Sequence, residues 1–115
     1  MKLVLLTLMI FAFPITTHAQ SALGNLSGCE RVAGQMESSD DVFILWPDRI
    51  ERWESTCEIT AVEGDLNRRS ILMTECFGEG DMLPQDFGMT PVGEDMFSIW
   101  PIEAPDVIFE LRMCG

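Results

Sequence analysis

The sequence predicts an all-β domain: a small antiparallel meander that forms a curved sheet or small barrel of about six to eight short strands, held by two disulfides. Short apolar segments rich in β-branched and aromatic residues alternate with turns that contain glycine, proline and aspartate. No segment shows a sustained apolar period of 3.6 residues with helix caps. Four cysteines follow an N-terminal segment that has the features of an export signal.

The export signal is predicted from residues 1–19. A basic residue precedes an apolar run of 11 residues, 3–13, which is too short to span a bilayer because a spanning helix needs about 20 residues. Thr17-His18-Ala19 places small residues at the −3 and −1 positions of a signal-peptidase site. We therefore expect cleavage after Ala19, no membrane span, and a periplasmic or secreted protein.

Residues 20–28 are expected to form a loose leader to a single domain, residues 29–115. Leu26-Ser27-Gly28-Cys29 also fits a bacterial lipobox, in which the cysteine is lipidated and becomes the new N-terminus. The apolar run ends well before this motif, and lipidation would leave three cysteines, an awkward number for an exported protein. Lipidation at Cys29 is therefore kept only as the alternative.

The first half of the domain contains three predicted strand regions. Residues 42–46 form a continuous apolar run, and Pro47-Asp48 turns the chain after it. Residues 50–62 are predicted to form a long strand or a bent pair, and residues 71–77 the next strand, after a turn at 63–70. In 50–62, one face at period two holds Trp53, Cys57, Ile59 and Ala61, and the other holds Arg52, Glu54, Glu58 and Thr60.

The second half has two further predicted strands, residues 96–100 and 107–113. Residues 78–81 break the preceding strand, and residues 82–93 are expected to be mostly loop because glycine and proline recur in them. In the last strand the residues expected to face inward are Val107, Phe109, Leu111 and Met113. Those expected to face outward are Glu110, Arg112 and Cys114, together with Thr74 and Cys76 of a neighbouring strand.

The cysteines fall into two similarly built halves, residues 29–57 and 76–114. Residues 40–47 and 94–101 are identical at four positions, 54 residues apart, and each copy lies between two cysteines. Among the three possible pairings, this order favours Cys29–Cys57 and Cys76–Cys114, each worth about 3–4 kcal/mol through chain entropy. Chance recurrence of strands that end in Trp-Pro is the alternative to duplication. The cysteine spacings lack the close pairs that zinc sites use.

Charge and missing residue types exclude several functions. The net charge is −12, and the chain after residue 19 keeps all 19 acidic residues but has no lysine, histidine or tyrosine. This composition excludes nucleophile systems that need histidine, histidine metal sites and lysine Schiff bases, and it opposes nucleic-acid binding. We therefore expect a binding or structural protein, not an enzyme, with no cofactor and no metal.

Carboxylates are the only plentiful reactive groups. One group is Glu51, Glu54 and Glu58, and another is Glu75, Glu79 and Asp81. Paired carboxylates are the machinery of glycoside hydrolysis, and Glu79-Gly80-Asp81 offers oxygen atoms to Ca²⁺. A solvated acidic surface, in which many acidic residues form close pairs by chance, and an ordinary turn explain the two groups, so neither is assigned a site. The same charge favours a cationic protein or peptide as the partner, which the domain would inhibit or sequester.

The three tryptophans, Trp46, Trp53 and Trp100, are candidate ligand-lining residues. In a small barrel they would line an apolar cavity, which gives a second alternative, a carrier of small apolar ligands. Ordinary core packing is the competing interpretation of these side chains.

The run Ile50-Glu-Arg-Trp-Glu-Ser-Thr-Cys57, with Cys76 at the end of a strand and Cys114 near the C-terminus, resembles small exported bacterial proteins of unknown function. Those proteins share a four-cysteine plan with an aromatic-Glu-Ser-x-Cys strand. The resemblance covers most of residues 28–115, and it implies an exported four-cysteine domain without assigned chemistry. The tryptophan that such proteins often carry shortly before the first cysteine is missing here.

Overall fold

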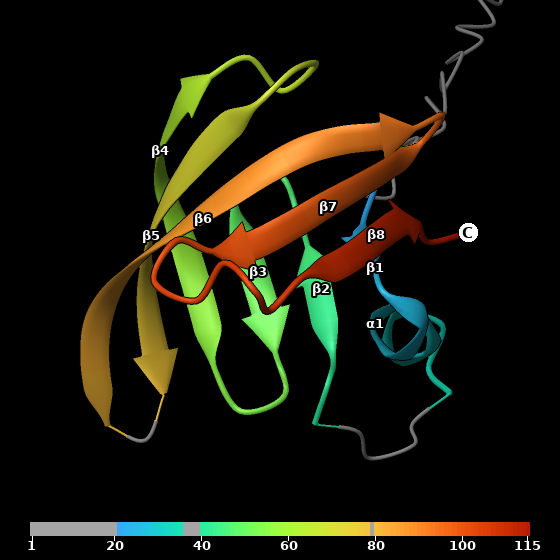
Figure 1. Cartoon of the computed structure of the whole chain (residues 1–115). Helices are drawn as coiled ribbons and strands as arrows, with labels where there is room; N and C mark the ends of the chain where they lie inside the picture. Colours follow the sequence, from blue (N-terminus) through green and yellow to red (C-terminus); the bar gives the residue numbers. More distant parts are fainter. Residues whose placement is uncertain (1–20, 36–39, 79) are drawn as a thin grey trace, which may run out of the picture.

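The computed structural model describes residues 21–35, 40–78 and 80–115. In this part of the chain eight antiparallel strands each pair with the next, and the first pairs with the last, so that the sheet closes into a barrel (Figure 1). The predicted all-β meander is therefore confirmed, in its barrel form. The predicted signal segment, residues 1–19, and its cleavage site lie outside the described residues.

The elements follow the chain in simple order around the barrel. They are β1 (Leu23–Gly24), α1 (Leu26–Val32), β2 (Phe43–Leu45), β3 (Arg49–Arg52), β4 (Thr56–Gly64), β5 (Ser70–Gly78), β6 (Asp81–Gly93), β7 (Met96–Pro101) and β8 (Phe109–Met113). In the view of Figure 1, the β3–β4 and β5–β6 turns lie at the lower end of the barrel and the β4–β5 turn lies at the upper end.

The region 50–62 is a bent pair, one of the two predicted forms. β3 ends at Arg52 and β4 begins at Thr56, with a bend between them. Along β4 the predicted alternation holds at first, since Cys57 is buried and Glu58 is exposed. A register shift between Ile59 and Ala61 then ends the alternation, and Ala61 is exposed rather than on the inner face.

The expectation of a loop at residues 82–93 is wrong, because this region belongs to the 13-residue strand β6. Proline normally interrupts a sheet because it has no N–H to donate. Here Pro84 pairs with β5 where β7 is not yet a neighbour, and Pro91 pairs with β7 where β5 is no longer a neighbour. Each proline thus lies where β6 has one partner strand rather than two.

The last strand is shorter than predicted. β8 begins at Phe109, and Val107 lies before it with 48% of its surface exposed. Leu111 is fully buried, as expected, but Met113 is 51% exposed at the end of the strand. Thr74, expected on the outer side, is instead buried among inward-facing residues, with 2% exposure.

Part of the expected leader, residues 20–28, has regular structure: residues 23–24 form a strand of the barrel, and residues 26–28 begin the helix α1. β1 pairs with both β2 and β8, and α1 follows it directly. Asn25 caps α1, because its side chain accepts a hydrogen bond from the Gly28 N–H at 2.8 Å. A β-carbon at Gly28 would lie 2.2 Å from the Phe43 carbonyl oxygen, so only glycine lets α1 pack this closely on β2. Among the described residues, no helix is long and apolar enough to cross a membrane.

Side chains fill the interior of the barrel. The Phe43 and Phe87 rings meet edge to face with centroids 5.9 Å apart, and Phe43 and Phe109 lie 4.8 Å apart. The buried members of this core are Phe43, Leu45, Ile50, Cys57, Leu72, Phe87, Met89, Ile99 and Leu111. The core is therefore a packed set of side chains from all around the barrel, as in other barrels of this strand number.

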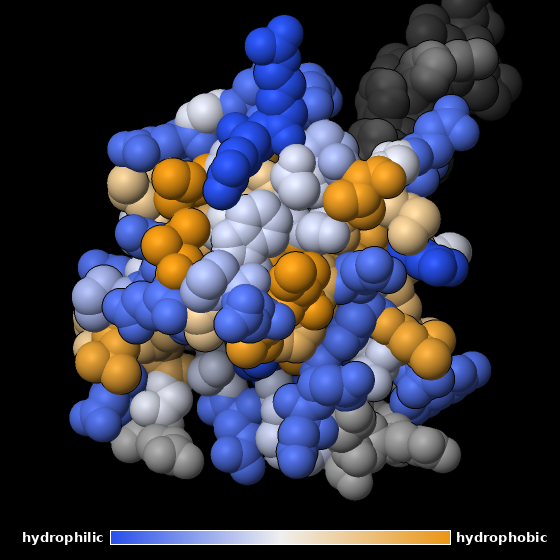
Figure 2. Space-filling view, viewed as in Figure 1, coloured by the Kyte–Doolittle hydropathy of each residue, from blue (hydrophilic) through white to orange (hydrophobic). Residues whose placement is uncertain are grey.

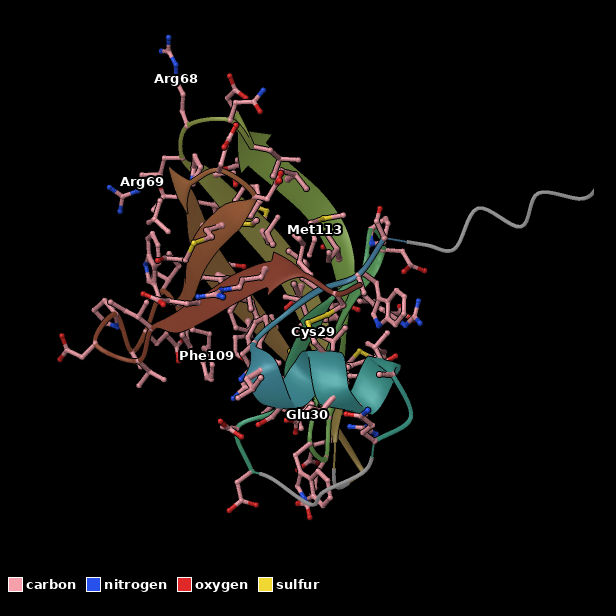
Figure 3. All side chains as sticks on the ribbon, turned by 90° about the vertical axis from the view of Figure 1, so that its right-hand side faces the viewer. Cys29, Glu30, Arg68, Arg69, Phe109 and Met113 are labelled. Atoms are coloured by element: carbon pink, nitrogen blue, oxygen red, sulfur yellow. A yellow bond between two sulfur atoms is a disulfide. The ribbon has the colours of Figure 1, made fainter. Side chains whose placement is uncertain are left out.

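Both predicted disulfide pairings are wrong. The bonds are Cys29–Cys114, with the Cα atoms 5.0 Å apart, and Cys57–Cys76, with the Cα atoms 3.8 Å apart. Cys57 and Cys76 are direct register partners in β4 and β5, while barrel closure brings the helix that follows β1 against the end of β8 (Figure 3). The repeated cysteine order suggested two separate lobes, but a closed meander joins neighbouring strands and the two ends of the chain.

The disulfides decide two further points. The Cys29 sulfur is bonded to Cys114 and is not available for a thioether to lipid, so the lipidation alternative is rejected. The described residues contain no free cysteine. Disulfides persist in oxidising environments, so the two bonds indicate a compartment outside the cytoplasm.

Candidate binding surface

The three tryptophans do not gather inside the barrel. Trp46 lies two residues beyond Ile44 on β2, and both belong to a separate small cluster rather than to the main core. Trp53 joins this cluster from the β3–β4 turn. Since Phe43 and Leu45 face the interior, alternation places Ile44 and Trp46 on the outer face.

Trp100 lies elsewhere, against β6. A β-carbon at Gly88 would be 2.5–2.6 Å from three atoms of the Trp100 indole, so the ring lies directly over the glycine backbone. The Arg69 guanidinium carbon is 5.6 Å from the centroid of the same indole. Trp46 and Trp53 thus share a cluster. Trp100 instead packs on the backbone of β6, and Arg69 of the β4–β5 turn lies over its ring.

A hollow of about 340 Å³ lies at the lower end of the barrel, and we call it the hairpin hollow. The β3–β4 turn, the end of β5 and the start of β6 supply its walls. Its lining residues are Glu54, Ser55, Cys76, Gly78, Asp81, Leu83 and Gln85. Antiparallel pairing explains this set, because Cys76 faces Leu83 and Gly78 faces Asp81 across the β5–β6 hairpin.

The hairpin hollow combines an apolar wall with carboxylates. Leu83 is 63% exposed, and it lies beside Cys76 of the buried disulfide. Glu54 and Asp81 are exposed, and neither forms an ion pair in the part of the chain that the structure describes. The Thr74 hydroxyl donates a hydrogen bond of 2.6 Å to the Gln85 carbonyl and ties the two strands together here.

The two carboxylate groups singled out in the sequence are each divided. Glu51 accepts a hydrogen bond from Arg49, and Glu58 lies opposite Glu75 in the β4–β5 ladder. The hairpin hollow brings together one member of each group, Glu54 and Asp81. Glu79, in the second group, lies outside the described residues.

A second hollow, of about 350 Å³, shares Glu54 and Ser55 with the first. Its remaining lining residues are Asp40, Arg52 and Trp53. The two hollows therefore flank the β3–β4 turn, and Glu54 contributes its carboxylate to both.

Arg52 in this second hollow was expected on the outer face, with Glu54, but it lies against the end of the core. Its guanidinium carbon is 5.1 Å from the Phe43 ring centroid and 4.7 Å from that of Phe109. Burial lowers the pKa of the Arg52 guanidinium from its usual range. Its Nε atom is buried and has no hydrogen-bond partner among the described residues. Period-two alternation from buried Ile50 was the signal that would have placed it correctly.

Most carboxylates have no cationic partner in the described part of the chain. Among the described residues, ion pairs are seen at Arg49, whose guanidinium lies 2.9 Å from Asp48 and 3.2 Å from Glu51. Within residues 21–35, 40–78 and 80–115, no three potential metal ligands converge. The described surface therefore provides negative charge and a partly apolar hollow for binding a partner.

No family model, curated protein or solved structure matches the chain. The resemblance to small exported four-cysteine proteins stays a prediction.

Proposed function

We propose that this protein is a periplasmic or secreted binding domain for a cationic protein or peptide, and that it acts without catalysis. The observation that carries this proposal is the excess of acidic over basic residues. The chain has 19 acidic and 7 basic residues, and ion pairs in the described part of it involve Arg49 alone. Surplus negative charge is therefore available to a partner.

An uncompensated field of this kind steers partners of opposite charge. Electrostatic attraction raises the association rate and discriminates against anionic partners more than it raises affinity. A cationic protein held in this way is sequestered or has its own surface blocked, so inhibition is the expected outcome for the partner.

The packed interior supports a surface-binding function over a carrier function. Small-ligand carriers enclose a cavity within the barrel, whereas the core positions here are filled by large side chains such as Phe43, Phe87 and Leu111. The hollows described above lie at the barrel end and are open to solvent.

The test is the binding of the purified, disulfide-bonded protein to a peptide of about seven lysines. The control peptide has the same length, with glutamine in place of lysine. We expect binding of the lysine peptide only, weakening at least about tenfold between about 10 mM and 150 mM salt, because the screening length falls from about 30 Å to about 8 Å. Failure to bind the lysine peptide at low salt, or binding that is indifferent to salt, overturns the proposal.

A further inference from the structure

We propose that the hairpin hollow is the docking point for the cationic partner, and that it receives a lysine or arginine side chain of that partner. This inference rests on the proposed function and adds a place and a contact chemistry to it. The whole surface is acidic, so net charge alone gives no docking point. The two ends of the barrel differ, however, in the charges and apolar side chains that they expose.

The lining of the hairpin hollow matches the chemistry of a long basic side chain. Lysine and arginine have an apolar stem and a charged head, and they bury the stem while the head stays at a polar rim. Leu83 and the Cys76 sulfur offer apolar contact for the stem. Glu54 and Asp81 line the same hollow from opposite elements, the β3–β4 turn and the start of β6, and supply carboxylates for the head.

Exposed apolar side chains also lie on the other face of the same hairpin. Phe77 and Met82 are register partners on the outer side of the β5–β6 hairpin, and they are 39% and 59% exposed. Leu83 lies on the face that lines the hollow with Glu54 and Asp81, so the tip of this hairpin exposes large apolar side chains on both of its faces. Clustered apolar exposure rimmed by charge is typical of a protein interaction site. Elsewhere, on the face shown in Figure 2, apolar side chains form small patches separated by hydrophilic ones.

The opposite end of the barrel has basic side chains that offset part of its negative charge. Arg68 and Arg69 lie together in the β4–β5 turn and project from the upper end of the barrel (Figure 3). They are exposed, and neither forms an ion pair in the part of the chain seen in the structure. Leu66, 50% exposed in the same turn, therefore lies among both acidic and basic side chains. The lining of the hairpin hollow has two carboxylates and no basic residue, so charge complementarity favours the hollow.

The partner is expected to dock through side chains and not by adding a strand. The first half of β6 pairs with β5 alone, which leaves its other edge open. Pro84 lies on that edge and has no N–H to donate, while Asp81 and Asp86 place charge along it. Proline and charge are common devices that protect an edge strand from pairing.

The experiment compares two variants of the full disulfide-bonded chain that lose the same charge at opposite ends. Glu54→Gln/Asp81→Asn removes both carboxylates of the hollow. Glu63→Gln/Glu94→Gln is the matched control, because Glu63 faces Ile71 near the start of β5 and Glu94 follows β6. With the heptalysine peptide at low salt, we expect the first variant to bind about five- to tenfold more weakly and the control to change less than about twofold.

The outcomes separate the two proposals. Equal weakening by both variants shows attraction by net charge with no docking point, which overturns the inference and leaves the proposed function standing. No binding by the unmodified protein overturns the proposed function itself. Circular dichroism and a count of free thiols verify that each variant is folded and oxidised.

A second measurement needs no charge variant. On addition of the lysine peptide to the unmodified protein, amide chemical shifts should change most at residues 76–85 and around Glu54. Shifts that centre on residues 62–69 contradict the inference. Leu83→Ser should weaken binding about threefold while the matched Leu66→Ser does not, since only Leu83 lines the hollow.

Discussion

The disulfide between Cys29 and Cys114 should contribute more to stability through chain entropy than the one between Cys57 and Cys76. The first bond spans 85 residues and the second spans 19. In the chain-entropy relation, these loops correspond to about 4.6 and about 3.2 kcal/mol at 25 °C. The whole free energy of unfolding of a small domain is about 5–15 kcal/mol, so the longer bond accounts for a large share of it.

The structure adds a local reason for the importance of the longer bond. β1 has two residues, and by pairing with both β2 and β8 it closes the barrel between them. The Cys114 N–H donates to the Ala22 carbonyl at 2.9 Å, and both sulfurs pack over Gly24, where an added β-carbon would lie within 3.1 Å of them. The bond therefore holds β1 and β8 together at the point where the barrel closes through the shortest strand pairing.

Removal of this bond is tested with Cys29→Ala/Cys114→Ala, measured by urea denaturation monitored through tryptophan fluorescence. We expect the free energy of unfolding to fall by about 4–5 kcal/mol. Amide hydrogen exchange should accelerate first in β1 and α1, while β4 and β5 keep their relative protection. Cys57→Ala/Cys76→Ala is the comparison, with loss of about 3 kcal/mol plus a packing term for the buried Cys57 sulfur. A loss below about 1.5 kcal/mol for the first variant, or no change at β1, refutes the reasoning.

Three other substitutions test contacts that stabilise the barrel. Gly88→Val should lower the free energy of unfolding by about 2 kcal/mol or more, because a β-carbon there displaces the Trp100 ring, and Trp100 fluorescence should shift toward that of an exposed indole. Glu75→Gln should raise the free energy of unfolding by a few tenths of a kcal/mol at low salt, since Glu58 lies directly opposite, and the gain should shrink at about 1 M salt. Arg52→Met should change the free energy by less than about 1 kcal/mol, because the lost cation–π contacts and the relieved desolvation oppose each other, whereas Arg52→Ala should cost about 2 kcal/mol of packing. Denaturation of each variant beside the unmodified protein measures all three effects.

Local patterns in the sequence were sufficient for much of the barrel. The short apolar runs that end in Trp-Pro predict β2 and β7, and the segment between the turn at 63–70 and the break at 78–81 predicts β5. The turn at residues 78–81 was recognised because glycine there permits the backbone to reverse, and Gly80 has a φ of 82°. These elements are determined by their own residues, so the local sequence is sufficient to predict them.

The elements that were missed depend on neighbours far away in the sequence. By sequence alone Pro84 and Pro91 predict a loop, but each lies where β6 has a single partner strand, a fact that only the register reveals. Gly88 is present because Trp100 packs on it, and not because the chain turns there. α1 has seven residues and depends on its cap and on contact with β2, so it has no apolar period to detect.

The candidate surface was only partly predictable. The carboxylate groups were visible in the sequence, but the meeting of Glu54 with Asp81 requires the β5–β6 hairpin to lie beside the β3–β4 turn. The disulfide pairing failed for the same reason, because the order of cysteines along a chain does not state which strands are neighbours. For Arg52, the charge of the side chain predicts an outward orientation, whereas the alternation from buried Ile50 correctly indicates the inner face.

Closure of the barrel by its first and last strands constrains the order of oxidation during biogenesis. Cys57 and Cys76 are ready to react as soon as the β4–β5 hairpin has emerged, whereas Cys29 has to wait for β8 and Cys114. Throughout that interval Cys29 is a free thiol close in sequence to Cys57. A non-native Cys29–Cys57 disulfide is therefore the main misfolding risk of this topology. Rapid pairing within the hairpin removes the competing thiol, and a disulfide isomerase becomes most useful when that step is slow.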